Sequence, residues 1–310
     1  MYYLSHGLHW LNNDSFLFYT LGSAIVSQYL SDKLSCLKKT VLFLALSGAY
    51  FLLPAQILRR PVAGAYTGFG AYSINHVDVF SFTANQASLA QLKNISAGVY
   101  GERRFLLNEL NNYTAAIGLP AATGNFGLKA NYSGFSDYNE TALGLAYGRK
   151  LGNKVDIGAQ FNYHGTRITG YGNASAISFE LGTIFHITEK LHAGVHTNNP
   201  VGGKFGKGQL EKLSSVYSFG IGYDASEKFL ISTEIQKEED QPVNVNAGIQ
   251  YKFLPQLLAR AGVSSATSSL WLGLGLTIKP FRLDISAGSH PQLGITPGLL
   301  LLFDFKKTSK

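Results

Sequence analysis

Four histidines and two carboxylates are the residues of this chain best suited to acid–base or metal chemistry. They are His164, His186, His192 and His196, with Asp156 and Glu180 nearby. On a β-strand, the spacing between His192 and His196 places both side chains on one face but about 13 Å apart. Two ligands at that separation cannot share a metal ion without help from others. We therefore predict no metal site.

Sequence motifs of enzymes are also missing. The chain contains neither a Gly-x-Ser-x-Gly nucleophile elbow nor a His-Glu-x-x-His zinc motif. The glycine-rich runs at 64–70 and 202–208 lack the strand, the glycine spacing and the helix of a nucleotide site. The first run fits a bend and the second a surface loop. We predict a protein without enzymatic activity and without a cofactor.

The histidines lie in segments where apolar residues alternate with small or polar ones. Between residues 270 and 278, every second residue is Leu or Ile, and the residues between them are Trp271, Gly273, Gly275 and Thr277. Segments 157–164 and 243–253 alternate in the same way. A period of two is typical of β-strands with two different faces. One face is suited to hydrocarbon, and the other to water or close packing.

About fourteen such segments follow one another from Ile95 to Phe305. They lie near 95–102, 110–118, 124–134, 139–150, 154–168, 176–187, 190–198, 214–223, 228–237, 243–252, 256–263, 269–278, 281–288 and 296–305. Most are long enough for a tilted strand to cross a bilayer. Short turns such as 152–153 and 279–280 alternate with longer loops at 135–138, 169–175, 198–213, 237–242 and 289–295. This predicts a short-turn periplasmic rim, which holds both mature termini, and a long-loop extracellular rim.

Composition agrees with a membrane barrel. Charged residues make up only 15% of the chain, against roughly 25% in soluble domains. Outside the N-terminal region no run of about 20 apolar residues occurs, which excludes a helical bundle. A soluble β-sandwich is the alternative, but it would not expose Leu, Ile and Tyr on nearly every strand. The formal charge of +7 is scattered, so we predict no nucleic-acid binding.

The N-terminal region has the features of an export signal. Lys38 and Lys39 precede the apolar stretch Val41–Leu53, and Pro54 and Ala55 follow it. We expect residues 1–55 to contain a signal peptide, cleaved after Ala55, and an N-terminal extension before it. The extension is not translated if synthesis starts near Leu34. An additional membrane helix is the alternative for the extension. An ordinary buried or anchoring helix is the alternative for the signal. Residues 56–94 then form an N-terminal plug and residues 95–306 the barrel.

Strand alternation also predicts which polar residues face the lumen. They are Glu102, Lys129, Asn131, Asp156, Gln160, Asn162, His164, Glu180, Glu234, Asn246, Gln250, Lys252, Arg260, Arg282 and Asp284. A lumen this polar argues against a continuous apolar tunnel, although Phe80, Phe82 and Leu89 could form an apolar pocket beneath the plug. The simpler alternative is a water-filled or plugged interior without a substrate.

The segment before the first strand carries a short motif. It contains Asp78 and then the run 85–90, in which Asn85, Ala87, Leu89 and Ala90 match an Asn-Pro-Ala-Gly-Leu-Ala pattern. Gln86 and Ser88 stand where that pattern has Pro and Gly. With a barrel following it, this region resembles the PorV/PorQ-like outer-membrane proteins of Bacteroidetes, which are related to FadL-type transporters.

The resemblance implies two functions. A PorV-like barrel would associate with type IX secretion components or exported cargo at the bacterial outer membrane, which is our first hypothesis. A FadL-like barrel would instead transport hydrophobic small molecules through a gap in its wall. Outer-membrane lipid or lipopolysaccharide is a partner in both cases. The loop Asn198–Leu213 fits either a surface for an extracellular partner or a solvated loop.

Overall fold

The computed structural model describes residues 66–202, 204–205, 211–266 and 268–305. The predicted signal peptide, and residues 56–65 of the predicted plug, lie outside the described residues. Within the described ranges, no helix has the length and apolar character needed to cross a membrane.

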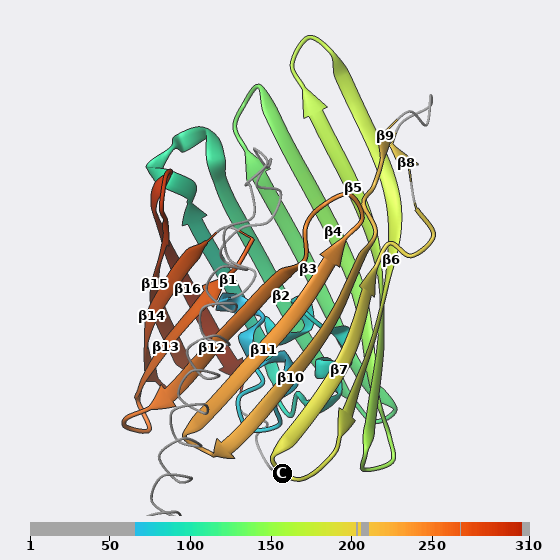
Figure 1. Ribbon diagram of the computed structural model, residues 1–310. Helices are drawn as coiled ribbons and strands as arrows, with labels where there is room; N and C mark the ends of the chain where they lie inside the picture. Colours follow the sequence, from blue (N-terminus) through green and yellow to red (C-terminus); the bar gives the residue numbers. More distant parts are fainter. Residues whose placement is uncertain (1–65, 203, 206–210, 267, 306–310) are drawn as a thin grey trace, which may run out of the picture. The chain divides into compact units, whose positions relative to one another are not determined.

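Fourteen strands close into one antiparallel barrel, in which β1 pairs with β16 (Figure 1). They are β1 (Ile95–Arg103), β2 (Asn111–Ala121), β3 (Gly124–Gly134), β4 (Tyr138–Leu151), β5 (Val155–Ile168), β6 (Gly172–His186), β7 (Leu191–Asn198), β10 (Val216–Ser226), β11 (Phe229–Glu238), β12 (Asn244–Lys252), β13 (Leu257–Ser264), β14 (Ser269–Ile278), β15 (Phe281–His290) and β16 (Gly294–Phe305). The prediction of an all-β barrel with about fourteen strands is confirmed.

The alternation of the sequence separates the two faces of the wall. On β14, Leu272 is 64% exposed on the outside, whereas its neighbour Trp271 is 2% exposed on the inside. The outer face of β12 carries exposed Ile249 and Tyr251, and Gln250 between them is buried. A continuous apolar exterior of this kind would be costly in water and is stable in hydrocarbon. The chain therefore has the fold of a transmembrane β-barrel.

Placing a charge on this exterior provides a test of the membrane-facing surface. Leu272→Arg should destabilise the barrel in a bilayer by about 2 kcal/mol, because a guanidinium would enter the hydrocarbon region. Unfolding in urea, followed in phospholipid vesicles, measures the loss. A matched control is Thr277→Arg, since Thr277 lies on the opposite face of the same strand, near its end. Equal losses in both variants would contradict the assignment of the outer face.

Two of the expected long loops are shorter than predicted. The strands β5 and β6 continue to a tight turn in which Ile168 pairs with Gly172, so the predicted loop 169–175 is mostly strand. Gly170 and Gly172 have positive φ values of 82° and 105°, which suit a sharp reversal without a side chain. Likewise, His290 pairs with Gly294, which replaces most of the predicted loop 289–295. Figure 1 shows β5 and β6 extending beyond the other strands.

The connection between β7 and β10 contains a small separate sheet. Its strands are β8 (Lys204–Phe205) and β9 (Glu211–Lys212), which pair antiparallel. At the base of this connection, Asn199 donates a hydrogen bond from its backbone N to the carbonyl of Phe179, at 2.7 Å. Ser215 donates its hydroxyl to the carbonyl of Asn199 at 2.8 Å. The predicted loop 198–213 is therefore hydrogen-bonded to the barrel and to Ser215 where it leaves β7.

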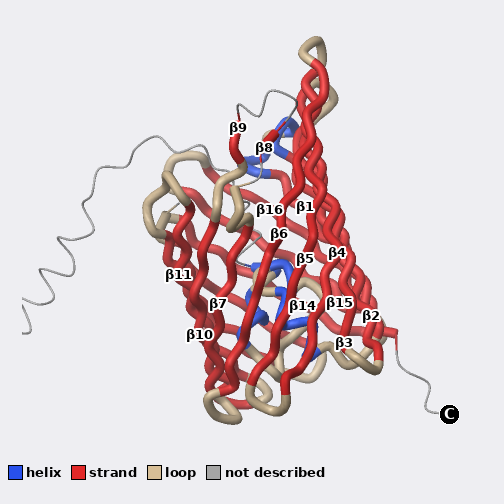
Figure 2. The backbone as a smooth tube through the Cα atoms, turned by 90° about the vertical axis from the view of Figure 1, so that its right-hand side faces the viewer, coloured by secondary structure: helices blue, strands red, loops and turns tan. Residues whose placement is uncertain are grey.

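The described part of the N-terminal segment lies inside the barrel, as Figures 1 and 2 show. It contains three short 3-10 helices, η1 (Phe69–Tyr72), η2 (Ser81–Thr83) and η3 (Gln86–Gln91). Phe80 and Phe82 are at most 1% exposed and form one apolar cluster with wall residues such as Leu230 on β11 and Leu300 on β16. We call residues 66–94 the inner segment.

Glycines on the inner face of the wall allow this segment to approach closely. A Cβ atom at Gly222 of β10 would lie 1.7 Å from the carbonyl oxygen of Tyr72. A Cβ atom at Gly158 of β5 would lie 2.5 Å from the backbone N of Ala87. No side chain fits at either position without moving the inner segment. The small residues that the sequence places on this face are thus matched to a second layer of chain.

Candidate functional site

Two polar networks, each centred on one carboxylate, fasten part of the inner segment to the wall, and the first of these carboxylates belongs to the segment itself. Asp78 Oδ2 accepts hydrogen bonds from Arg282 Nη2 at 2.7 Å and from Arg260 Nη2 at 3.4 Å. Arg282 Nε also donates to Asp284 Oδ1 at 3.0 Å, and Tyr66 donates its hydroxyl to Asp284 Oδ2 at 3.0 Å. The two acidic side chains, Asp78 and Asp284, balance the charge of the two basic side chains, Arg260 and Arg282. We call these four residues the Asp78 anchor.

Electrostatics keep Asp78 ionised. Burial alone would raise the pKa of its carboxyl, but the two guanidinium groups of Arg282 and Arg260 outweigh burial and lower that pKa below its ordinary value. The backbone N of Phe80 adds a hydrogen bond to Asp78 Oδ1 at 3.0 Å. At neutral pH the Asp78 anchor is therefore a full ion-pair network, which is costly to break because its charges are out of bulk water.

The second carboxylate belongs to the wall. Asp224 of β10 accepts hydrogen bonds from the Ser73 hydroxyl at 2.7 Å, from the Ile74 backbone N at 3.0 Å and from the Asn75 backbone N at 3.3 Å. Its side chain is buried and lies 3.4 Å from His192 Nε2. We call Asp224 and residues 73–76 the Asp224 anchor. Asp224 was not among the predicted lumen residues, although it shares the inner-face parity of Gly220 and Gly222 on its strand.

His76 connects the two anchors and is held neutral. Gln250 Nε2 donates to His76 Nδ1 at 2.6 Å, which leaves the proton of the imidazole on Nε2, near the carbonyl of Ser226. Burial, helped by the nearby Lys252 ammonium, lowers the pKa of His76 to about 4. Asp224 opposes this shift and Arg260 supports it.

This depressed pKa predicts that acid loosens the inner segment. Because the pKa of His76 is about 4 when packed and 6.5 when free, attachment is strongest above pH 6.5 and weakens as the pH falls towards 4. Lowering the pH from 7 to 4.5 should raise the open fraction of barrels on the order of tenfold, measured as ion conductance in planar bilayers. His76→Gln should remove most of that dependence. An unchanged pH profile in this variant would contradict the assignment to His76.

The predicted motif fixes the third helix, η3, against β3 to β7. Asn85 caps η3 by accepting from Ala87 N at 3.0 Å, and its amide donates to the carbonyl of Val195 at 3.2 Å. Leu89 packs against the glycines Gly127 and Gly148. Ala90 is 8% exposed, and a Cβ atom at Gly148 would lie 3.1 Å from its backbone N. These motif residues thus either cap η3, as Asn85 does, or pack closely against glycines of the wall, as Leu89 and Ala90 do.

The polar wall around η3 centres on Glu180 of β6. Glu180 accepts from Gln160 Nε2 at 3.0 Å and from Asn162 Nδ2 at 2.7 Å, and it also accepts from Gln86 of the inner segment. His196 Nε2 lies 3.0 Å from the same carboxylate. Gln86 therefore replaces the proline of the PorV-like motif with an amide that hydrogen-bonds to the wall.

His164, His186 and His192 have different partners. His186 lies 2.9 Å from Asp156, and its Nδ1 is 3.0 Å from His192 Nδ1. His164, which is half-buried, lies 2.9 Å from the Ser178 hydroxyl. In the part of the chain that the structure describes, no group of three or more His, Cys, Asp or Glu side chains is placed to hold a metal. The geometry fits polar packing of a lumen.

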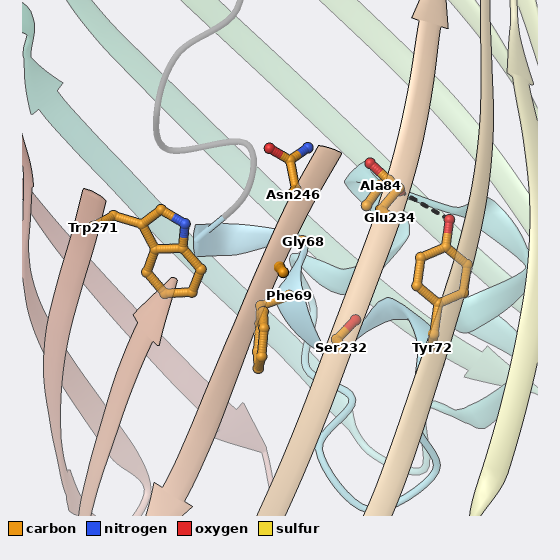
Figure 3. Close-up of a pocket in the computed structure, with 9 residues that line it drawn as sticks. Gly68, Phe69, Tyr72, Ala84, Ser232, Glu234, Asn246 and Trp271 are labelled. Atoms are coloured by element: carbon orange, nitrogen blue, oxygen red, sulfur yellow. Dashed lines mark hydrogen bonds between the residues drawn. The ribbon is translucent and has the colours of Figure 1, made fainter. Parts of the chain in front are cut away.

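Above η1 the lumen wall holds a recess, drawn in Figure 3. Its lining comes from η1 and the residue before it, from Ala84 between η2 and η3, and from β11, β12 and β14. The lining residues are Gly68, Phe69, Tyr72, Ala84, Ser232, Glu234, Asn246, Ala247 and Trp271. Tyr72 donates its hydroxyl to Glu234 at 2.9 Å. The recess has a volume of about 30 Å³, which is room for one or two heavy atoms.

The structure thus sorts nine of the fifteen predicted lumen residues into three groups. Gln160 and Asn162 are buried in the wall around Glu180, with His164 beside them; Glu234 and Asn246 line the recess; Gln250, Arg260, Arg282 and Asp284 support the anchors. Trp271 was placed on the inner face by alternation but not selected as a site residue. The sequence feature that could have identified Trp271 is that it is the single large aromatic residue among glycines on that face of β14.

Comparisons with known proteins show which solved structures have a similar fold. No family model and no curated protein sequence matches the chain. The CymD monoaromatic hydrocarbon channel is similar in structure, with a TM-score of 0.59 and 12% identity over 79% of this chain and 97% of the other. A Pseudomonas aeruginosa FadL homologue has a TM-score of 0.56 and 11% identity, covering 78% and 97% of the two chains. The Ralstonia pickettii toluene transporter TbuX has a TM-score of 0.54 and 10% identity, covering 74% and 94%.

The fold is therefore similar to that of FadL-type outer-membrane channels. The resemblance to PorV/PorQ-like proteins rests on Asp78 and the motif at 85–90 followed by a barrel, and these structures add no support for it.

Proposed function

We propose that this protein is a bacterial outer-membrane barrel that admits small hydrophobic molecules. The observation that carries the proposal is the inner segment, which fills the lumen and is fastened to the wall by the Asp78 and Asp224 anchors beside the apolar cluster of Phe80 and Phe82. Polar contacts such as those of the two anchors can be exchanged for water when the segment moves. The likeness to hydrocarbon channels supports the same function.

In this proposal residues 56–94 form a plug, residues 95–306 the barrel and residues 1–55 the export signal. Ile95 of the first strand pairs with Phe305 of the last strand at one end of the barrel, and in this proposal that end is the periplasmic rim, where both mature termini lie. Lipid and lipopolysaccharide contact the exterior. No enzymatic step is required for this function. Secretion, our first hypothesis, has no structural observation in its favour.

Uptake of radiolabelled toluene by cells that express this chain tests the proposal. In an outer membrane that lacks other FadL-type channels, we expect uptake several-fold faster than in vector controls, with arabinose uptake unchanged. Folding in the membrane is checked by the heat-dependent mobility of the barrel on gels. Uptake equal to the vector control, from a folded barrel, would overturn transport. Stoichiometric co-purification of exported proteins would instead favour secretion.

A further inference from the structure

The indole of Trp271 is a buried hydrogen-bond donor without a partner. Its Nε1 has no acceptor among the described residues, although the side chain is 2% exposed. An indole N–H can only donate, so no reassignment of atoms supplies the missing contact. A buried donor left in this state costs free energy and is uncommon in folded proteins.

Packing fixes the direction of this donor. Tyr66 and Phe69 both meet the indole edge-on, with ring centroids 5.6 Å away in each case. Wall glycines lie beneath the ring, since a Cβ atom at Gly262 would lie 2.2 Å from it. Figure 3 shows the nitrogen on the side of the ring that faces the other lining residues. The N–H is therefore held toward the recess and cannot easily turn away.

The recess sets the chemistry of the group that would complete this bond. It lies beside the rings of Phe69 and Tyr72 and has space for one or two heavy atoms. Its described lining includes no Lys or Arg, so an anion would enter without charge compensation. A neutral molecule with an acceptor oxygen on an apolar body meets all three conditions. Its oxygen accepts the hydrogen bond from Trp271 Nε1, fits the small recess and brings no charge into it.

We propose that the recess is a subsite for neutral hydrophobic molecules that carry an acceptor oxygen, such as a ketone, which bonds to Trp271 Nε1. The oxygen occupies the recess and the apolar body lies at its mouth. This assignment rests on the transport function proposed above and narrows its substrate class. It separates oxygenated molecules from pure hydrocarbons and from carboxylates.

The test compares three probes of similar size on the full chain in detergent. Acetophenone has the acceptor, α-methylstyrene replaces its oxygen by a methylene group, and benzoate carries a charge. The chain has two tryptophans, Trp10 and Trp271, so Trp10→Phe leaves one indole N–H signal for NMR. We expect acetophenone to bind roughly tenfold more tightly than α-methylstyrene and to move that signal downfield. Trp271→Phe, which keeps an aromatic ring, should lose the preference.

Three results would overturn the subsite: equal affinity for acetophenone and α-methylstyrene, an indole signal that acetophenone does not move, or tighter binding of benzoate. The second would mean that water alone occupies the recess. The NMR readout requires no change at Trp271, so it stands even if Trp271→Phe does not fold. Toluene uptake without a ketone preference would remove only the subsite. A ketone preference without uptake would remove only the transport function.

Discussion

Replacing Asp78 by Ala is expected to release the inner segment in a large fraction of barrels. The substitution leaves Arg260 and Arg282 in the lumen with only Asp284 as a common partner, at 3.8 Å and 3.0 Å. Removing one side of a buried ion pair costs several kcal/mol, because the remaining charge stays away from water. We expect the attachment to weaken by about 4 kcal/mol, which corresponds to a roughly 1000-fold larger open population.

A cysteine reporter measures this release. Ser88 of η3 is fully buried, and Cys36 is the single cysteine of the chain, so Ser88→Cys in a Cys36→Ser background gives one thiol inside the barrel. Its labelling rate by a maleimide follows the open population when opening and closing are fast. Asp137→Ala is the matched control, since this exposed carboxylate lies in the connection between β3 and β4. Equal labelling rates in Asp78→Ala and Asp137→Ala would contradict the role of the Asp78 anchor.

The wall of this barrel could be predicted from sequence because each strand carries its own information. Alternation at 270–278 already separates Leu272 from Trp271, and the structure places them outside and inside. Strand limits failed where pairing continues beyond the bilayer, as in the β5–β6 turn at Gly170 and Gly172. There the residues are small and polar and have no apolar face to signal a strand.

The inner contacts could not be predicted, because they join positions that are far apart in the chain. Asp78 and Arg282 are separated by 204 residues, and Ser73 and Asp224 by 151. Parity indicates that such residues face the lumen but not which of them meet. Trp271 shows the same limit, since its lack of a partner depends on how Tyr66 and Phe69 hold the ring. From the sequence, Gly222 is only a residue that weakens a strand. The structure shows why a glycine is needed there, because Tyr72 packs directly against it.

Asp224→Ala is expected to have the second-largest effect, by a different route. Here the carboxylate comes from the wall, and its loss leaves the Ser73 hydroxyl and the backbone N–H groups of Ile74 and Asn75 without their acceptor. Each unsatisfied buried donor costs about 1 kcal/mol or more, so the attachment should weaken by about 3 kcal/mol. The Ser88→Cys reporter should label roughly 100-fold faster.

Combining the two substitutions distinguishes a plug that leaves as one body from one that opens in parts. If the inner segment moves as a unit, both anchors must break in every opening. The two free energies should then add, because Asp78 is held by β13 and β15 whereas residues 73–75 are held by β10. If η3 can move while η1 stays, Asp224→Ala should not change labelling at residue 88. In that case the contacts of Asn85 and Gln86 with β6 and β7 would control access, and Gln86→Ala would become the variant with the larger effect. Ser81 is also fully buried and can carry a second reporter. If the inner segment moves as one body, Asp78→Ala should increase labelling more than Asp224→Ala at residue 81, as at residue 88.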